Sequence, residues 1–252
     1  MTGSPTQSWS ADLYASHASF VPHQGVAWVD ALGPLDGLDV LDLGCGDGVL
    51  SRRLVERGAT VVGVDASPEL IAAAKDKGLD ARVVDGRELA FDREFDLVFS
   101  HAALHWMKPP QPVLRGVRHA LRPGGRFVAD MGGAGNVAFE AAALEAALDR
   151  RGLDGKAANP WYFPTPNMYR QFLDEAGFIV DAIESFERPT PIDSDIEGWL
   201  ATFAETFLRQ VDTAERAVVI AEVADSLRPH LSHDAGNWTL DYVRLRFSAH
   251  VD

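Results

Sequence analysis

The alternation of short apolar runs with helix-like segments between residues 40 and 131 constrains the fold of this chain most. Strand-like runs are expected at residues 40–43, 60–64, 81–84, 95–100 and 126–131. Most of the helix-like segments between them close at glycine, a residue well suited to end a helix. Repeated strand–helix units of this length favour a parallel sheet with helices on both faces. The sequence therefore predicts an α/β fold.

The second half of the chain is different and richer in helices. Helices are expected at residues 136–151, 167–176, 195–210 and 214–227, and strands at 178–186 and 238–251. We interpret the extra helices as a lid on one domain that spans residues 1–252. Its expected parts are an N-terminal flap and helix (1–35), a ligand-binding core (36–132), helical cap elements (133–177 and 190–236) and C-terminal strands (178–189 and 238–251).

Composition and charge narrow the class of protein. With 46% hydrophobic and 24% charged residues, the composition is that of an ordinary globular protein. A formal net charge of −14 argues against broad binding to nucleic acid or anionic membrane, which depends on clustered lysine and arginine. The single cysteine, Cys45, excludes an intramolecular disulfide framework and a zinc site built mainly from cysteine, and no metal is expected.

The sequence also lacks the patterns of a membrane span and of a secretory signal. No apolar run approaches the ~20 residues needed to cross a bilayer. The N-terminal residues show no basic region followed by an apolar core, which a secretory signal would need. We therefore expect a cytoplasmic protein, a monomer or weak homodimer, whose partner is a small molecule.

The most informative motif is the glycine-rich turn that follows the first expected strand, residues 40–48 (VLDLGCGDG). Bare glycine backbone at the carboxyl edge of an α/β sheet lets a ligand approach closely. A dinucleotide site would need a third glycine at position 49, which is Val49. A phosphate-cradling loop would need a lysine followed by serine or threonine, and none follows. The acids Asp42 and Asp47 favour instead a nucleoside ligand without phosphates.

Two further acids stand at the ends of expected strands. Asp65 ends the second strand, where a carboxylate can accept hydrogen bonds from both hydroxyls of a ribose. Asp85 ends the third, where it can accept from the exocyclic amine of an adenine. Either acid alone is explained as well by capping of a turn or helix. Together with the glycine turn, they favour a nucleoside site.

These motifs, in this order, resemble those of the class I S-adenosylmethionine-dependent methyltransferases. The resemblance covers about residues 38 to 132 and rests on the segments 40–48, 63–67 (GVDAS), 84–86 (VDG), 95–100 (FDLVFS) and 121–127 (LRPGGRF). It implies a Rossmann-like sheet of seven strands, the last one antiparallel, with helices on both faces and a helical lid. It also implies that S-adenosylmethionine is the cofactor and S-adenosylhomocysteine the product.

The resemblance assigns cofactor contacts position by position. The glycines of the turn would line the methionine moiety, Asp65 would bind the ribose, Asp85 the adenine amine, and Asp42 would lie near the amino group. The full set of expected cofactor-binding residues is Tyr14, Asp42, Gly44, Cys45, Gly46, Gly48, Asp65, Ala66, Asp85, Gly86 and Ser100.

A finer resemblance concerns the acceptor. Residues 9–14 (WSADLY) before the first helix and 102–106 (AALHW) after the fourth strand look like the trans-aconitate methyltransferase branch. The late helical lid agrees with that branch. The resemblance implies a small-molecule acceptor, without identifying it as trans-aconitate.

Methyl transfer from a sulfonium is an in-line displacement, for which positioning alone can supply roughly 7–11 kcal/mol of the barrier. The candidate base is His101, directly after the fourth expected strand, because a histidine can accept a proton near neutral pH. The alternative is a histidine that only packs or hydrogen-bonds at the pocket wall. Further residues expected near the acceptor are Trp9, His17, His105, Trp106, Asp130, Met131 and Tyr162, with Arg188 and Arg209 as candidate partners of an acceptor carboxylate.

We expect O-methylation of a small metabolite, with a carboxylate among the candidate acceptors. N- or C-methylation in natural-product tailoring is the alternative within the same class. A protein that keeps the fold and cofactor but transfers no methyl group is the alternative from a different class. A nicotinamide oxidoreductase is disfavoured by Val49.

Overall fold

The computed structural model describes residues 7, 9, 16–17, 20–192, 195–232 and 237–252. The chain divides into two compact units, which are described separately. The sheet unit comprises Val21–Ala134, Tyr162–Phe186 and Arg244–Asp252. The helical unit comprises Gly135–Trp161 and Glu187–Val243, together with the N-terminal residues up to Phe20. No helix of the described residues is long and apolar enough to cross a membrane.

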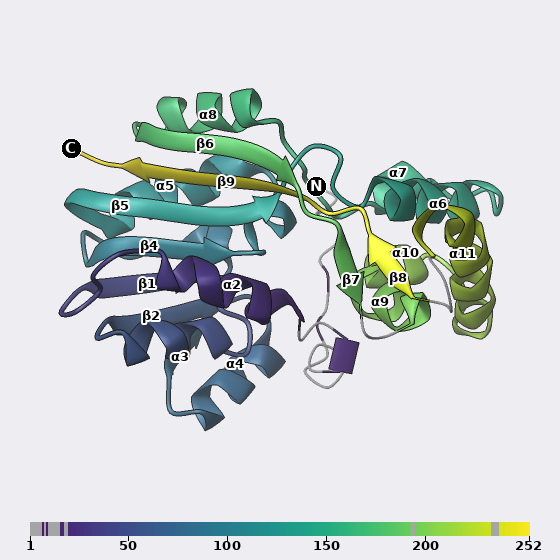
Figure 1. Cartoon of the computed structure of the whole chain (residues 1–252), viewed down its shortest axis with the longest axis horizontal. Coiled ribbons are helices and arrows are strands. Elements are labelled where there is room, and N and C mark those ends of the chain that lie inside the picture. The colour runs from purple at the N-terminus through teal and green to yellow at the C-terminus, as the bar shows by residue number, and fades with distance from the viewer. Residues whose placement is uncertain (1–6, 8, 10–15, 18–19, 193–194, 233–236) are drawn as a thin grey trace. The chain divides into compact units, whose positions relative to one another are not determined.

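The sheet unit is built on a seven-stranded sheet with the order β3-β2-β1-β4-β5-β9-β6 (Figure 1). Neighbours from β3 to β5 are parallel, and β9 pairs antiparallel with β5. The strands are β1 (Asp39–Leu43), β2 (Thr60–Asp65), β3 (Asp80–Val83), β4 (Phe95–His101), β5 (Leu121–Gly132), β6 (Ile179–Glu187) and β9 (Val243–His250). This arrangement confirms the predicted Rossmann-like sheet with its last strand antiparallel.

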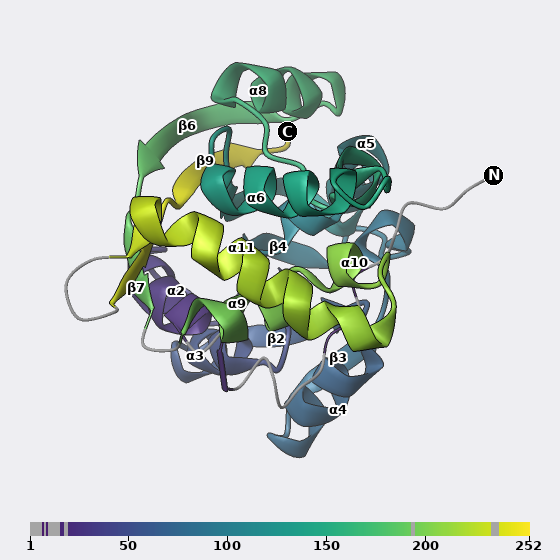
Figure 2. The same ribbon diagram turned by 90° about the vertical axis from the view of Figure 1, so that its right-hand side faces the viewer.

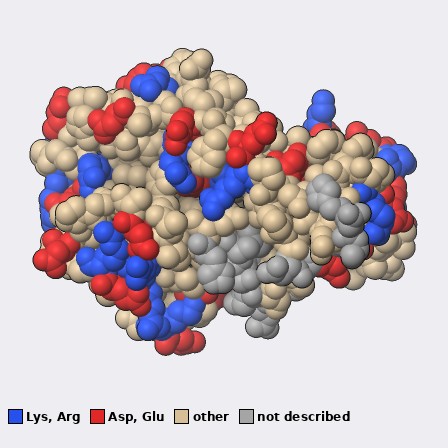
Figure 3. All heavy atoms as spheres, in the orientation of Figure 1, with Lys and Arg blue, Asp and Glu red and all other residues tan. Residues whose placement is uncertain are grey.

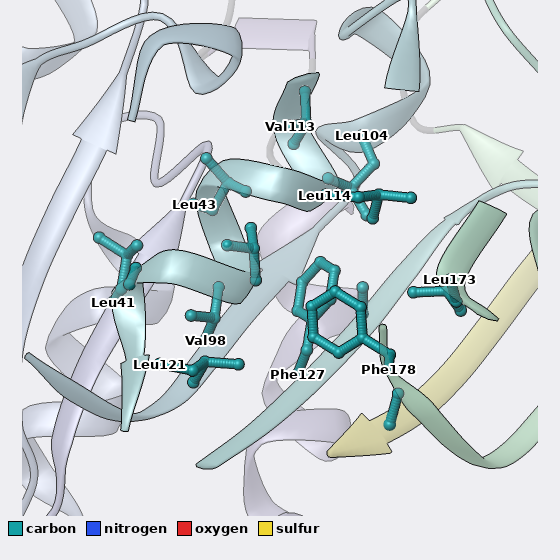
Figure 4. Close-up of a cluster of buried hydrophobic side chains, with 14 of the residues drawn as sticks. Leu41, Leu43, Val98, Leu104, Val113, Leu114, Leu121, Phe127, Leu173 and Phe178 are labelled. Atoms are coloured by element: carbon teal, nitrogen blue, oxygen red, sulfur yellow. The ribbon is translucent and has the colours of Figure 1, made fainter. Parts of the chain in front are cut away.

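Helices cover both faces of this sheet. They are α2 (Phe20–Asp30), α3 (Val49–Glu56), α4 (Pro68–Asp76), α5 (Pro110–Ala120) and α8 (Pro166–Glu175), with short 3₁₀ turns η1 (Gly86–Glu88) and η2 (Leu104–Trp106). Side chains of α2 and α3 pack with Val40, Phe99 and Val128 of the sheet. Side chains of α5 and α8 pack on the opposite face, where Phe127 and Phe178 lie with ring centroids 5.8 Å apart (Figure 4). Burial on both faces explains why the central strands read as continuous apolar runs.

Local sequence signals place the helix starts. The amide of Leu70 donates to the Ser67 hydroxyl at 3.3 Å, and Pro68 occupies the first turn of α4. The Thr165 hydroxyl caps α8 in the same way by accepting from the Met168 amide at 3.3 Å. Serine or threonine at the cap followed by proline satisfies an otherwise unpaired amide and presets the helical backbone.

The helical unit contains α6 (Ala138–Asp149), α7 (Gly155–Ala158), α9 (Ile196–Phe203), α10 (Glu205–Leu208), η3 (Thr213–Glu215), α11 (Arg216–Leu231) and the two-stranded sheet of β7 (Thr190–Ile192) and β8 (Trp238–Leu240). Helices α6 and α11 lie side by side (Figure 2). Its core is aromatic: the Trp199 indole donates to the Tyr242 hydroxyl at 3.0 Å, and Trp161 packs on Trp199 and Phe207.

Two expected elements are each divided in the structure. The helix expected at 195–210 is interrupted at Ala204, which separates α9 from α10. The strand expected at 238–251 forms β8 in the helical unit and β9 in the large sheet. In the same way, Pro189 lies between β6 of the large sheet and β7 of the helical unit. A proline cannot donate a ladder hydrogen bond, so it favours the end of a strand.

A pair of carboxyl groups lies at the start of α6. Asp241 accepts from the amides of Ala138 and Phe139 at 3.0 and 3.3 Å, while Glu140 is fully buried. Burial and the neighbouring Asp241 hold the pKa of Glu140 well above its ordinary value. Neither Glu140 oxygen has a hydrogen-bond partner among the described residues. Burial and the nearby Asp241 carboxyl therefore both disfavour a charge on Glu140.

This pair predicts a pH-dependent stability. An acid whose pKa is higher in the folded than in the unfolded state contributes its full stabilisation below the unfolded value and loses it as pH rises through the folded value. Thermal unfolding midpoints between pH 5 and 9 should therefore fall less steeply in Glu140→Gln, whose amide donates at every pH. The matched control is Glu184→Gln on exposed β6. Equal slopes in wild type and Glu140→Gln would contradict the raised pKa of Glu140.

Charged side chains of both signs lie close together on the face drawn in Figure 3. Among the described residues no group of three or more histidine, cysteine or acidic side chains is arranged to hold a metal ion.

Candidate functional site

The glycine-rich turn after β1 has a backbone that only glycine adopts readily. Gly44, Gly46 and Gly48 have φ angles of 77°, 56° and 82°, all in the left-handed region. The amides of Gly44 and Cys45 donate to the carbonyl of Val64 at 2.8 and 3.0 Å, so the turn is anchored on β2. Helix α3 begins directly after Gly48.

The three glycines differ in what surrounds them. A Cβ on Gly44 would lie 2.1 Å from the Ala103 Cβ, and one on Gly48 would lie 2.2 Å from a methyl carbon of Leu79. A Cβ on Gly46 would meet no described heavy atom within 4 Å. Close packing therefore requires two of the glycines, while Gly46 leaves open space at the carboxyl edge of the sheet.

Asp65 at the end of β2 lies next to this open space. Its carboxylate accepts from the Gly46 amide at 3.1 Å and from the Ser67 amide at 2.9 Å, with a further backbone hydrogen bond from Ala66. Burial nevertheless raises its pKa above the ordinary value. The expected residues Gly46, Asp65 and Ala66 are thus brought together, as a nucleoside site at this edge requires.

Asp85 stands at the expected place after β3, but its carboxylate already has a partner. The Arg87 guanidinium donates to both oxygens, at 2.9 and 2.5 Å, and this interaction lowers the pKa of Asp85. An adenine amine bound here has to share the carboxylate with Arg87. Beside it, Gly86 is required by packing, because a Cβ there would lie 2.6 Å from the Met107 sulfur.

Three other expected cofactor residues lie inside the protein, below the turn. Asp42 is 2% exposed and accepts from the Ser51 hydroxyl at 2.6 Å; burial raises its pKa to about 7, an effect opposed by this hydrogen bond. Ser100 is fully buried and donates to the Leu43 carbonyl at 2.7 Å. Burial also raises the pKa of the Cys45 thiol, which packs on Gly63. All three hold the turn, and direct cofactor contacts by them stay a prediction.

The candidate base His101 is the last residue of β4 and lies opposite Asp130 of β5 in the parallel register. Its side chain is 8% exposed. The Asp130 carboxylate, 1% exposed, accepts from Arg244 Nε at 2.6 Å and from Arg246 Nη2 at 3.0 Å. The two arginines lower the pKa of Asp130 although burial opposes this, so the carboxylate is ionised.

His105 joins this cluster from η2. Its Nδ1 accepts from the Gly132 amide at 3.2 Å, which fixes the proton of the neutral ring on Nε2. Burial, Arg244 and His101 together hold its pKa well below the ordinary value. Its backbone carbonyl accepts from the Tyr162 amide at 2.9 Å, and its ring lies 5.5 Å from that of Trp106. His101, His105, Trp106, Asp130 and Tyr162 are therefore neighbours within the sheet unit.

The other residues expected near the acceptor are distributed over both units. Met131 is fully buried in the core on the α5 and α8 side of the sheet. Trp9 and His17 belong to the helical unit, where Trp9 packs edge-on to Phe203 and the His17 ring lies against Gly198. Arg209 pairs with Glu205 at 3.0 Å in the same unit, which also contains Arg188. Tyr14 lies outside the described residues.

Sequence reasoning missed four residues that shape the site. Arg244 and Arg246 hold Asp130, Met107 fills the space beside Gly44 and Gly86, and Ser51 binds Asp42. The arginines had a detectable signal: they alternate with apolar residues in a strand whose neighbours are buried.

The donor set of the turn fits the expected cofactor. Open space at Gly46, a carboxylate at Asp65 and acids on both sides of the turn suit a ribose and an ammonium group. Lys77, the lysine near the turn, is paired with Asp47 at 2.6 Å. Gly46, Asp65 and Asp85 are the residues that would hold S-adenosylmethionine.

Comparison with known proteins agrees with this fit. A family model described as a methyltransferase domain matches residues 41–129. An uncharacterized methyltransferase of Schizosaccharomyces pombe is 40% identical over 98% of this chain and all of its own length. A trans-aconitate 2-methyltransferase of Mycobacterium tuberculosis is 31% identical over 70% of each chain.

Solved structures share the fold at low sequence identity. A putative methyltransferase from Bacillus halodurans aligns over 90% of this chain and 98% of its own, with a TM-score of 0.62 and 16% identity. A phosphoethanolamine N-methyltransferase from Haemonchus contortus, solved with S-adenosylhomocysteine, aligns over 91% of this chain and 52% of its own, with a TM-score of 0.57 and 22% identity. This chain belongs to the class I S-adenosylmethionine-dependent methyltransferases.

Proposed function

We propose that this methyltransferase transfers the methyl group to an oxygen atom of a small, anionic metabolite. The observation that carries the proposal is the cluster at the carboxyl ends of β4 and β5. One carboxylate, Asp130, is matched there by two guanidinium groups, Arg244 and Arg246, so the three groups carry a net positive charge. A net positive charge beside His101 favours an acceptor that carries a carboxylate.

The chemistry needs little from the protein beyond positioning. S-adenosylmethionine supplies a methyl group on a sulfonium, and the acceptor oxygen needs a free electron pair aimed at it. A carboxylate oxygen has that pair near neutral pH. A hydroxyl oxygen on the same kind of acid needs a base, and we assign that role to His101. Arg246, whose side chain is 31% exposed, is the guanidinium more accessible to the acceptor's charge.

The sequence relationship to a trans-aconitate 2-methyltransferase supports the same acceptor class. That protein is named for methylating a tricarboxylic acid, and the shared region covers 70% of each chain.

The test is incubation of the purified protein with methyl-labelled cofactor and panels of carboxylic acids, hydroxy acids, phenols and amines. A methyl ester releases its label as volatile methanol in mild base, whereas a methyl ether or methylamine retains it. We expect labelled products among the acids. Label confined to amines or to carbon would favour the N- or C-methyltransferase alternative. Tight cofactor binding without any labelled product would favour a non-catalytic role.

A further inference from the structure

We propose that Asp130, clamped by Arg244 and Arg246, is a positioning residue that fixes the orientation and the charge state of His101. The inference rests on the proposed function only in taking His101 to face the acceptor. Its structural basis lies entirely within the sheet unit.

The backbone places His101 and Asp130 side by side. They are paired in the register of β4 and β5, and residues that alternate with them, Phe99 and Val128, share the sheet face covered by α2 and α3. Side chains two residues apart on a strand point the same way, so His101 and Asp130 also point to this face. The Ala102 amide donates to the Asp130 carbonyl at 2.7 Å, which anchors the strand end next to His101.

The turn after His101 is strained, which argues for a fixed geometry. Ala102 has a φ of 55°, in the region that residues with a side chain seldom adopt. Such strain persists where the surroundings hold the backbone in place. Helix α2 approaches the ring closely at Gly25: a Cβ there would lie 3.2 Å from His101 Cε1. The imidazole therefore has the backbone of α2 as a close neighbour, which limits its freedom to move.

The Asp130 carboxylate is itself fixed by a two-sided clamp. Arg244 Nε donates to one oxygen at 2.6 Å, and Arg246 donates to the other from Nε and Nη2 at 3.2 and 3.0 Å. Arg246 is held in turn by the Trp28 ring of α2, whose centroid lies 3.7 Å from the guanidinium carbon. Arg244 Nη2 also donates to the Asp130 carbonyl at 3.2 Å, so one guanidinium binds both the carboxylate and the backbone of Asp130.

Among the described residues, the charged groups named above as neighbours of His101 come from different elements, so each can be changed separately. β5 contributes Asp130, β9 contributes Arg244 and Arg246, and η2 contributes His105, whose ring is neutral. Gly25 of α2 lies near both the His101 ring and Leu50 of α3, and neither Gly25 nor Leu50 carries a side-chain charge. The carboxylate favours the imidazolium form of His101, and the guanidinium groups oppose it.

The two partners of the clamp should therefore shift the protonation of His101 in opposite directions. In Asp130→Asn, loss of the carboxylate should lower the titration midpoint of the His101 Cε1 proton, followed by NMR, by about one pH unit. In Arg246→Gln, loss of one positive charge should raise the midpoint by a smaller amount. Arg246→Lys keeps the charge and should leave the midpoint near that of the wild type. Arg82→Gln, in an exposed pair with Asp80, is the distant control.

The outcomes separate the inference from the proposed function. Midpoints that do not move, or that move in the same direction in Asp130→Asn and Arg246→Gln, overturn the role of Asp130. If Asp130→Asn does not fold, the comparison of Arg246→Gln with Arg246→Lys still decides, because only the first removes charge. Opposite NMR shifts together with an unchanged pH profile of methyl transfer support the positioning of His101 by Asp130 and reject His101 as the base.

Discussion

Replacing Arg244 by methionine should lower the free energy of unfolding by about 3 kcal/mol, the lower end of the range for a broken buried ion pair. The Arg244 and Asp130 side chains are 4% and 1% exposed. After the substitution, water therefore cannot reach the Asp130 carboxylate to replace the hydrogen bonds that Arg244 donated. Arg246 still holds the second oxygen, which keeps the loss from being larger. Chemical denaturation monitored by tryptophan fluorescence and circular dichroism measures the change.

The control for Arg244→Met is the same substitution in an exposed pair. Arg53 binds Asp30 at 2.8 Å with both side chains about 40% exposed, at 39% and 43%. Exposed ion pairs contribute little to stability, so Arg53→Met should leave the free energy of unfolding close to that of the wild type. If Arg244→Met lowers the free energy of unfolding as little as Arg53→Met does, the ion pair of Arg244 with Asp130 does not stabilise the fold.

The cofactor edge could be predicted from the sequence because its determinants are local. A parallel α/β sheet brings the carboxyl ends of its strands to one edge, so residues that end successive strands must be neighbours. Asp65 illustrates this: it ends β2, and its carboxylate binds the amide of Gly46 in the turn after β1. The turn conformation is equally local, since left-handed φ angles at the alternate positions Gly44, Gly46 and Gly48 favour glycine.

The acceptor side could not be predicted in the same way, because its contacts join distant segments. Arg244 and Asp130 are 114 residues apart and meet only through the antiparallel register of β5 and β9. Local pattern gives no pairing register between distant strands. The alternation of arginine with apolar residues in β9 was a usable signal, because charge inside a covered sheet requires a buried partner.

Short-range pairing limited another expectation. The sequence assigns Asp85 to a ligand as the expected end of the third strand. In the structure β3 ends at Val83, and Arg87 folds back on the Asp85 carboxylate. The 3₁₀ turn that begins at Gly86 makes this approach possible, and Asp85 caps it by accepting from the Arg87 amide at 2.9 Å. The capping interpretation and the ligand interpretation therefore apply to the same residue.

Replacing Gly46 by alanine should weaken cofactor binding about tenfold while leaving the protein folded. The new methyl group meets no described atom within 4 Å, so it projects into the open space where the cofactor is expected. Overfilling a packed site by one methyl group costs about 1–3 kcal/mol, and 1.4 kcal/mol corresponds to about tenfold in affinity. Isothermal titration calorimetry with S-adenosylhomocysteine measures the effect without depending on the acceptor.

The chain offers a closely matched control in Gly78, which ends the turn after α4. Its φ is 80°, and a Cβ there also meets no described atom within 4 Å. Alanine in a left-handed conformation costs roughly 1–2 kcal/mol, so Gly46→Ala and Gly78→Ala should lose similar stability. Only Gly46→Ala should lose affinity for the cofactor. Both variants carry the same backbone strain, but only Gly46 lies at the edge of the sheet where the cofactor is expected. Equal affinities in the two variants would place the cofactor away from Gly46, and the open space at the turn would then need another occupant.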